Sequence, residues 1–503
     1  MTVSAPTCLY ETHSGVVTLY GDRAFKVKKP IATDFLDFST PESREQACAR
    51  ELELNRRMAP DVYLGIAHFV DPTARSAEPV LVMRRMPRQR RLSTLVADPT
   101  WDSTRLSALA TMIADFHDEA RRGPEIDAEG SPDRLESRWL SLIRPLRARP
   151  SVDTDRLARV EHLALRFIRG RGHLFAQRVA EGMIVDGHGD LLAQDIFDLP
   201  DGFRVLDCLD FDDRLRYLDR LDDIAFLAMD LEFLGRGDLG TALLAAYRRR
   251  TGDSAPDALV HHYIAYRALV RAKVDLIRAD QGAESAAERA ERHLVITERH
   301  LAEAAVRLVL VGGLPGTGKS TVAAELAAAT GATALSSDHV RRELLATGEL
   351  DGTPGSFGAG LYSPDNKARV YRELLIRAEQ RLESGVSVVL DASWIEADER
   401  THARDLAVRV GADLIELQCV CPPGVAAERI AARHRTDSDA TAAIAADMGR
   451  AEKTWRDAVR LDTDRALPHT VGDAVRIWRN GGQYKTTVPS VAAPLPVRSC
   501  LVP

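Results

Sequence analysis

Hydrophobic and polar positions follow two different patterns in the two halves of the chain. In the first half, β-forming runs at 16–20 and 24–28 flank Gly21-Asp22, which indicates a hairpin. Further elements are expected as a helix over 41–58, a strand over 80–86 and helical stretches over 104–122, 134–169 and 243–279. Strands followed by many helices predict an α+β domain.

From residue 307 onward, short apolar runs alternate with helical stretches. Strands are expected around residue 310 and over 332–336, 387–390 and 414–420, each followed by a helix. Such alternation predicts an α/β domain with a parallel sheet, and continuous apolar runs such as LVLVG fit strands buried on both faces. Ligands of such sheets bind beyond the carboxyl ends of the strands.

These patterns divide the chain into four segments. We expect the α+β domain over 1–282, a connecting helix rich in Ala, Glu and Arg over 283–305, the α/β domain over 306–480 and a disordered tail over 481–503. At 503 residues the chain is too long for a single core.

Composition narrows the functional classes. The net charge of −7 supplies no basic surplus, so a nucleic-acid partner is not favoured. Six cysteines form no disulfide framework, and Cys419 and Cys421 are spaced as strand residues rather than as a zinc motif. Neither a signal segment nor an apolar run of membrane-spanning length is present, which predicts a cytoplasmic protein without a membrane partner. The sequence does not determine the oligomeric state.

A phosphate-binding loop is indicated by Gly313 to Ser320, which satisfy G-x-x-x-x-G-K-[ST]. Its glycines let successive backbone N–H groups converge on phosphate oxygens, Lys319 adds a positive charge, and Ser320 can offer its hydroxyl to Mg²⁺. A glycine-rich turn that only connects two elements is disfavoured, because both a strand and a helix flank it. We therefore expect ATP and Mg²⁺ as cofactors, with nucleotide-binding residues Gly313, Leu314, Pro315, Gly316, Thr317, Gly318, Lys319, Ser320 and Thr321.

Two carboxylates follow neighbouring strands of this domain. Asp338 follows the second strand and is expected to orient an acceptor hydroxyl; its alternative role is to cap the next helix. Asp391 ends the VVLD strand and is expected to hold Mg²⁺ or its water, or else is an ordinary strand-end residue.

Side chains around this edge provide further candidates. Arg429 and Arg433 share one helix face, where they would stabilise the transferred charge or form a solvated basic helix. The Gly- and Pro-rich segment 347–366 is expected to be a mobile loop over the acceptor. Substrate contacts are expected from Arg341, Tyr362 and Asn366.

His188-Gly189-Asp190 begins a second candidate site. Asp195 follows, then an expected strand over 203–209 and the acidic run that begins at Asp210. A calcium-binding EF-hand is excluded, because the sixth position counted from Asp210 is leucine where that loop requires glycine.

The pattern H-G-D-x-x-x-x-[N/D], followed by a strand ending in Leu-Asp-Phe, resembles the catalytic and metal loops of the aminoglycoside phosphotransferase group, relatives of the protein kinases. The resemblance implies a kinase-like fold for the first domain. It implies that Asp190 acts as base toward the acceptor hydroxyl, that Asp195 is the first metal ligand, and that Asp210 or Asp207 is the second.

The resemblance extends upstream, where Lys26 corresponds to the strand lysine that holds the α/β-phosphates and Glu51 to its helix partner. The chain also departs from the pattern. Asp195 stands where the family has asparagine, Leu192 stands where it has histidine, and no G-x-G-x-x-G precedes them. Both a working kinase and a nucleotide-binding domain of weak activity remain open.

The P-loop, the SSD-x-x-R turn, the VVLD strand and R-x-x-x-R together resemble the P-loop kinase branch of gluconate, chloramphenicol and polynucleotide 5′-hydroxyl kinases and zeta-type toxins. The domain order resembles bacterial tandem proteins with an aminoglycoside phosphotransferase-like domain and an ATP-binding domain.

These resemblances imply an α+β kinase-like domain followed by an α/β P-loop NTPase domain with a parallel sheet. The expected function is an ATP-dependent phosphotransferase with two nucleotide sites and a small-molecule hydroxyl as acceptor. The alternatives are a nucleotide-gated interaction protein with a pseudokinase half and a nucleic-acid 5′-hydroxyl kinase.

Overall fold

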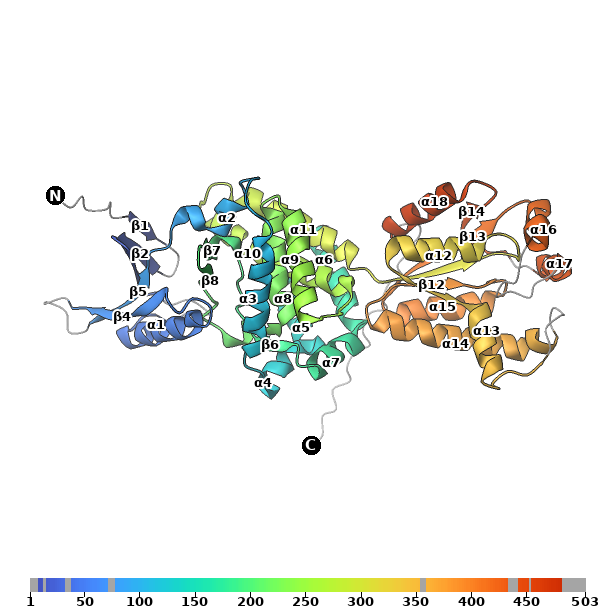
Figure 1. Ribbon diagram of the computed structural model, residues 1–503, viewed down its shortest axis with the longest axis horizontal. Coiled ribbons are helices and arrows are strands. Elements are labelled where there is room, and N and C mark those ends of the chain that lie inside the picture. The colour runs from blue at the N-terminus through green and yellow to red at the C-terminus, as the bar shows by residue number, and fades with distance from the viewer. Residues whose placement is uncertain are drawn as a thin grey trace, which may run out of the picture. The chain divides into compact units, whose positions relative to one another are not determined.

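The chain forms two compact units (Figure 1). One unit comprises Met1–Ala305 with Glu383–Gly385, and the other comprises Val306–Leu382 with Val386–Pro503. This computed structural model describes residues 8–11, 15–31, 38–70, 77–352, 359–432, 442–451 and 454–481. Within the expected tail, residues 482–503 lie outside the described part of the chain.

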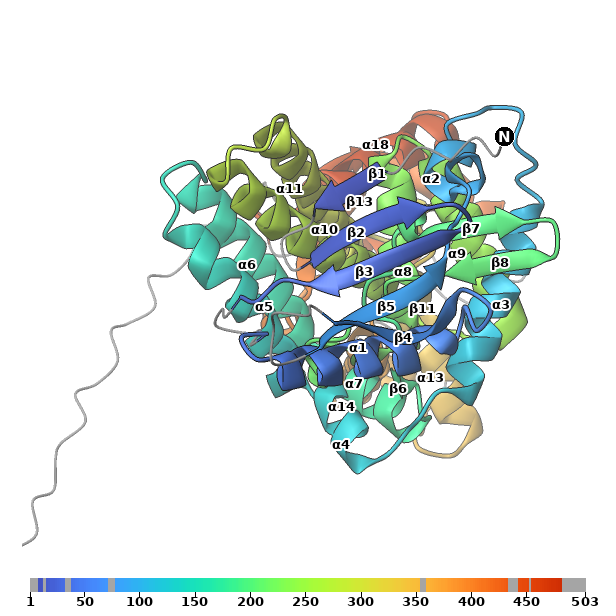
Figure 2. The ribbon, with the colours of Figure 1, turned by 90° about the vertical axis from the view of Figure 1, so that its left-hand side faces the viewer.

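The first unit begins with a five-stranded antiparallel sheet of order β1-β2-β3-β5-β4 (Figure 2). Its strands are β1 (Cys8–Glu11), β2 (Gly15–Tyr20), β3 (Arg23–Lys28), β4 (Tyr63–Phe69) and β5 (Glu78–Arg84). Gly21-Asp22 forms the expected hairpin turn, with Tyr20 paired to Arg23 and Gly21 at φ 58°. Helix α1 (Pro41–Arg56) packs against β4 and β5, and a capping box of Thr40 and Ser43 begins it.

Helices make up most of the rest of this unit. They are α2 (Leu92–Leu95), α3 (Arg105–Glu119), α4 (Pro124–Asp127), α5 (Pro132–Arg147), α6 (Thr154–Arg169), α7 (Gly172–Ala180), α8 (Arg220–Phe233), α9 (Gly237–Thr251), α10 (Asp257–Asp280) and α11 (Ala286–Glu303). Short 3₁₀ turns are η1 (Arg88–Arg90), η2 (Ala128–Gly130), η3 (Ala193–Asp195) and η4 (Asp213–Leu215). Helix α11, in the segment expected to connect the domains, packs on α10 within this unit.

Two expected helical stretches of this unit are divided, and one expected strand is shorter than its pattern indicated. The stretch 134–169 is two helices, because Pro150 interrupts it and Asp153 caps α6. The stretch 243–279 is likewise divided, with Gly252 at φ 69° ending α9. The strand expected over 203–209 ends at Val205, since Asp207 adopts a left-handed backbone at φ 62°.

Two small antiparallel sheets of two strands each carry the HGD segment of the first unit. β6 (Ile184–Asp186) pairs with β9 (Tyr217–Asp219), and β7 (Ile196–Leu199) pairs with β8 (Gly202–Val205). The loop His188–Leu192 therefore leaves the end of β6 and reaches η3 just before β7.

The second unit has a parallel sheet of order β11-β12-β10-β13-β14, as the alternation predicted. Its strands are β10 (Arg307–Gly312), β11 (Thr333–Ser336), β12 (Val388–Asp391), β13 (Asp413–Val420) and β14 (Val459–Asp462). Its helices are α12 (Lys319–Thr330), α13 (Ser337–Ala346), α14 (Pro364–Glu383), α15 (Ala397–Arg409), α16 (Pro423–Ala431), α17 (Ala442–Ala451) and α18 (Leu467–Arg479), with a 3₁₀ turn η5 (Gly360–Tyr362).

The central strand β10 is buried along its whole length and packs with α12 and α18 in one core. Sequence reasoning missed β14, which is short and contains only one buried side chain, Leu461. Among the described residues, the structure contains no helix that is both long and apolar enough to cross a bilayer.

Candidate active sites

The loop after β10 has a backbone that only glycine adopts without strain. Gly313, Gly316 and Gly318 have φ angles of 142°, 85° and 82°. A Cβ atom on Gly313 would lie 2.6 Å from the Cys419 carbonyl oxygen, and one on Gly316 would lie 2.4 Å from the Ala426 carbonyl oxygen. Helix α12 begins at Lys319 directly after this loop, so its first N–H groups and its dipole are directed to the loop. The loop is therefore shaped to bind an anion.

Contacts on both sides stabilise this loop. Thr317 Oγ1 donates to the Leu314 carbonyl oxygen at 2.8 Å, which closes the turn. The Gly313 N–H donates to the Ser393 carbonyl oxygen at 3.3 Å, which ties the loop to the segment after β12. Pro315 is buried, whereas Lys319 is half-buried and Ser320 and Thr321 are exposed. The loop backbone is thus fixed by hydrogen bonds, while the side chains expected to bind the ligand remain accessible to solvent.

Asp391 lies at the carboxyl end of β12, between Val311 of β10 and Ser336 of β11. Its side chain is buried, and burial raises its pKa, while Lys319 and the hydroxyls of Ser320 and Ser336 lower it. Its Oδ1 atom is buried without a hydrogen-bond partner in the described part of the chain. An orphaned carboxylate oxygen beside the P-loop serine fits a bound Mg²⁺ ion or its coordinated water.

Asp338 lies one strand further along the same sheet edge. Ser336 Oγ accepts from the Asp338 N–H at 3.3 Å and caps α13, so the interpretation of Asp338 as the cap is wrong. Its Oδ1 instead accepts from Arg341 Nη1. The charge of Asp338 also raises the pKa of Asp391, which indicates that the two carboxylates are near each other. Asp338 therefore lies near Asp391 at the same edge of the sheet.

The remaining candidates of the second unit have different surroundings. Arg341 lies 4.6 Å from the ring centre of Tyr362. Asn366 Nδ2 donates to the Asp351 and Gly360 carbonyl oxygens, which commits its amide to the backbone of the preceding segment. Arg429 Nη2 donates to the Thr463 carbonyl oxygen at 2.8 Å, and its Nη1 lies 3.8 Å from where a Gly318 Cβ would stand. Arg433 lies outside the described residues.

In the first unit, Glu51 of α1 pairs with two lysines of β3. Its Oε1 is 2.7 Å from Lys26 Nζ, and its Oε2 is 2.7 Å from Lys28 Nζ. Burial would raise the pKa of Glu51, but the two ammonium groups outweigh burial and lower it to about 2. This ion triad orients Lys26 at the inner face of the sheet.

Three carboxylates gather next to Lys26. Asp207 Oδ1 lies 3.4 Å from Lys26 Nζ. Burial, then Asp207 and Asp190, raise the pKa of Asp195 well above its usual range. Burial also raises the pKa of Asp190 to about 6, against the charges of Arg271 and Arg267. Crowded carboxylate oxygens that repel one another fit a divalent cation such as Mg²⁺.

The structure separates the two alternatives for the second metal ligand. Asp207 lies with Asp195 and Lys26, whereas Asp210 Oδ2 lies 2.8 Å from Lys28 Nζ. Asp207 is therefore the better candidate, and Asp210 helps to hold the lysine pair.

Sequence reasoning missed the group that fixes the Asp190 loop, which is Asp223 of α8. Its Oδ2 accepts from the His188 N–H at 2.6 Å and its Oδ1 accepts from the Gly189 N–H at 2.9 Å. A Cβ on Gly187 would lie 2.5 Å from the same carboxylate, and His117 Nε2 lies 3.1 Å from it. The signal was present in LDDIAFLAMDL, where acidic residues interrupt a helix that is otherwise apolar and buried.

Two further side chains support this loop. Arg267 Nη1 donates to the Gly189 carbonyl oxygen at 3.2 Å while pairing with Asp222, and Asp230 Oδ2 accepts from the Ala193 N–H at 2.8 Å. Asp190 thus projects from a loop whose backbone is held on both sides.

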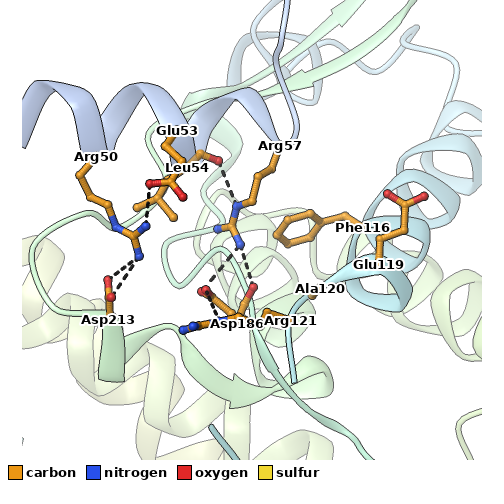
Figure 3. Close-up of a pocket in the computed structure, with 10 residues that line it drawn as sticks. All are labelled: Arg50, Glu53, Leu54, Arg57, Phe116, Glu119, Ala120, Arg121, Asp186 and Asp213. Carbon is orange, nitrogen blue, oxygen red and sulfur yellow. Dashed lines mark hydrogen bonds and ion pairs between the residues drawn. The ribbon is translucent and has the colours of Figure 1, made fainter. Parts of the chain in front are cut away.

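A pocket of about 550 Å³ lies between α1, the end of α3 and the β6–β9 hairpin (Figure 3). Arg57 spans it, donating to the Asp186 and Gly187 carbonyl oxygens, and Arg50 pairs with Asp213 at 2.9 Å. The pocket shares no lining residue with the carboxylate group beside Lys26. Its charged residues therefore join α1 to the segment that leads into the Asp190 loop.

Comparison with known proteins places the chain in a family. Residues 308–454 match the family described as an AAA domain. "Uncharacterized protein Rv2004c" of Mycobacterium tuberculosis is 49% identical over 472 residues, which cover 93% of this chain and 95% of that protein. The chain belongs to the family of this mycobacterial protein.

Two solved structures are each similar to a part of this chain. A choline/ethanolamine kinase family protein from Mesorhizobium loti is 16% identical, covers 60% of this chain and 92% of its own, and has a TM-score of 0.38. A sugar kinase from Janibacter sp. is 21% identical, covers 36% and 97%, and has a TM-score of 0.29. In its own topology, the chain combines an α+β unit built on an antiparallel sheet with an α/β unit that carries the P-loop and matches the AAA-domain family.

The P-loop geometry predicts that Gly316→Ala weakens nucleotide binding by roughly tenfold or more, because a Cβ cannot fit against the Ala426 carbonyl oxygen at a φ of 85°. Titration with a fluorescent ATP analogue measures this, with Lys26→Ala in every variant so that the first unit does not contribute. Gly331→Ala is the matched control, since Gly331 also has a positive φ of 71° but nothing within 4 Å. If Gly331→Ala weakened nucleotide binding as much as Gly316→Ala does, backbone strain alone would account for the loss of affinity.

The buried ion triad predicts that Glu51→Gln lowers the free energy of unfolding by about 3 kcal/mol at neutral pH. The pKa of Glu51 is depressed in the folded state, so its contribution is present above pH 4.5 and is lost as the pH falls toward 2. Urea unfolding at pH 7 and at pH 3 should therefore show a smaller difference between variant and parent at pH 3. Glu53→Gln, on the exposed side of α1, should change neither value appreciably.

Proposed function

We propose that this protein is an ATP-dependent phosphotransferase with two nucleotide sites, and that its second unit transfers the γ-phosphate to a hydroxyl group of a small molecule. The observation that carries the proposal is the arrangement of Asp391 beside Lys319 and Ser320, with one carboxylate oxygen buried and unpartnered. The kinase folds of both units support phosphoryl transfer in general.

In the second unit, the loop amides and Lys319 bind the β- and γ-phosphates, and Ser320 and Asp391 hold Mg²⁺. Mg²⁺ held there would supply positive charge to neutralise the phosphate oxygens. Asp338 orients the acceptor hydroxyl and takes its proton at the carboxylate, whose Oδ1 is held by Arg341. Because the transition state is loose, positioning by this carboxylate matters more than its basicity. Arg429, beside Gly318, stabilises charge on the transferred group.

In the first unit, Lys26 binds the α/β-phosphates, and Asp195 and Asp207 hold Mg²⁺ by carboxylate oxygens. Asp190 orients a second acceptor. Arg271 lies near enough to Asp190 to lower its pKa. Two such sites in one chain suit sequential phosphorylation or regulation of one site by the other.

A nucleotide-gated interaction protein is the second candidate, and the crowding of three carboxylates in the first unit favours it. At Asp195, where related kinases have asparagine, burial and the charges of Asp207 and Asp190 raise the pKa well above its usual range, which favours the neutral form over an ionised metal ligand. Such a protein would hydrolyse ATP slowly and ignore every acceptor.

Lys319→Ala is predicted to abolish ADP formation that depends on the acceptor of the second unit, because it removes the charge at the β- and γ-phosphates. Asp190→Asn is predicted to abolish a different acceptor-dependent activity. A panel of sugars, aminoglycosides and nucleosides with Mg-ATP, read by ADP release, measures both. Lys29→Ala and Asp201→Asn are the controls, since these residues pair with Glu11 and Arg204 away from both sites. The proposal fails if neither test variant changes phosphate transfer.

Asp338→Asn is predicted to lower kcat by roughly 10²- to 10⁴-fold while leaving the Kd of ATP unchanged, because it removes only the proton acceptor. Asp391→Asn should instead raise the Mg²⁺ concentration needed for half-maximal rate. Steady-state kinetics over a Mg²⁺ series separates the two roles. A rise in the Mg²⁺ requirement for Asp338→Asn alone would reverse the assignments.

A further inference from the structure

A cluster of metal-ligating side chains lies in the first unit, on the facing sides of α10 and α11. His261 of α10 and His300 and Glu303 of α11 place one ligand atom each within 4.8 Å of one another. His261 Nδ1 is 2.9 Å from His300 Nδ1 and 3.2 Å from Glu303 Oε2, and His300 Nδ1 is 3.8 Å from the same oxygen. Ligands of a tetrahedral metal with bonds of about 2.1 Å lie about 3.4 Å apart, so these three separations bracket that value.

The outer nitrogen of His300 is already oriented by a carboxylate. His300 Nε2 lies 2.9 Å from Glu232 Oε2 of α8, and Arg299 also contacts Glu232. Arg299 Nη2 lies 3.2 Å from the same ring nitrogen, so Nε2 is engaged by its own charged neighbours and Nδ1 is the nitrogen that faces His261 and Glu303. Metal-binding histidines are held in this way by a carboxylate on the far ring nitrogen.

Negative charge predominates around the two rings. Asp257, Glu303 and Glu232 face this pair with negative charge, and Arg299 faces it with positive charge. Such surroundings suit a bound cation, and imidazole nitrogens are the commonest metal ligands in proteins.

We propose that His261, His300 and Glu303 form a binding site for a divalent transition metal, with Zn²⁺ as the best fit to two imidazoles and one carboxylate. His300 is buried, while the side chains of His261 and Glu303 are 31% and 45% exposed, so one side is open for a water as fourth ligand. Because Glu303 is the last residue of α11, the metal fastens the end of this helix to α10. Its role is structural or regulatory, and it is independent of the nucleotide sites.

A hydrogen bond from His261 to His300 would also explain the 2.9 Å contact without a metal. The two explanations differ in their response to added ions, because a hydrogen-bonded pair gains nothing from Zn²⁺. The test therefore uses the full-length protein freed of metal with a chelator, then supplied with excess Mg²⁺ to occupy the oxygen-rich sites.

Co²⁺ titration followed by its visible absorption, and Zn²⁺ competition against it, should reveal one equivalent bound with tetrahedral geometry. His261→Ala and His300→Ala should each weaken Zn²⁺ binding by about 100-fold or more. Glu232→Gln should weaken it by about 10- to 100-fold, since it acts through His300. His162→Ala, an exposed histidine of α6, is the matched control and should bind as the parent does.

Thermal unfolding supplies an independent measurement, because a metal that binds the folded chain raises its Tm. Zn²⁺ should raise the Tm of the parent and of His162→Ala, and leave that of His300→Ala unchanged. His261→Gln replaces His261→Ala if the latter fails to fold. The proposal is overturned if the parent binds no Co²⁺ or Zn²⁺, or if saturable binding persists in both histidine variants.

Discussion

Carboxylates removed from water need a cation or N–H donors, and this constraint shapes the first unit and the sheet edge of the second. Asp223 is fully buried and accepts from two backbone N–H groups, and Asp222 is matched by the guanidinium of Arg267. Such satisfied carboxylates hold the fold together. Asp195 and Asp391 differ from these two carboxylates. Asp195 lies beside two other acidic side chains. Asp391 has one oxygen without a hydrogen-bond partner in the described chain. A metal ion bound beside Asp391 would contact the oxygen that has no partner in the described chain.

Helix α1 contacts two parts of the first unit that carry candidate site residues. Glu51 on one side of the helix positions Lys26 and Lys28 on the sheet. Arg57, just beyond its end, donates to the backbone that leads into the Asp190 loop. A displacement of this one helix would therefore disturb Lys26 and the Asp190 loop together. The paired charges around the pocket of Figure 3 make that coupling direct.

How much could be predicted from the sequence depended on how local each feature is. The P-loop was readable because eight consecutive residues carry it, and the parallel sheet was readable from alternation. The choice between Asp207 and Asp210 could not be predicted from the sequence, because it depends on a left-handed turn at Asp207 that ends the strand early. The role of Asp223 was not predicted, because its carboxylate accepts from backbone N–H groups 34 and 35 residues away in the sequence. The insertion of β12 between β10 and β11 likewise depends on packing between distant segments.

The two carboxylates proposed to orient acceptors each lie near arginine, supplied in different ways. Asp338 pairs with an arginine one helical turn away on its own helix, whereas Asp190 lies near Arg267 and Arg271 from a different helix. For Asp190, these guanidinium groups oppose the rise in pKa that burial causes. Phosphoryl transfer through a loose transition state requires a well-positioned carboxylate more than a basic one, so both arrangements suit the proposed chemistry.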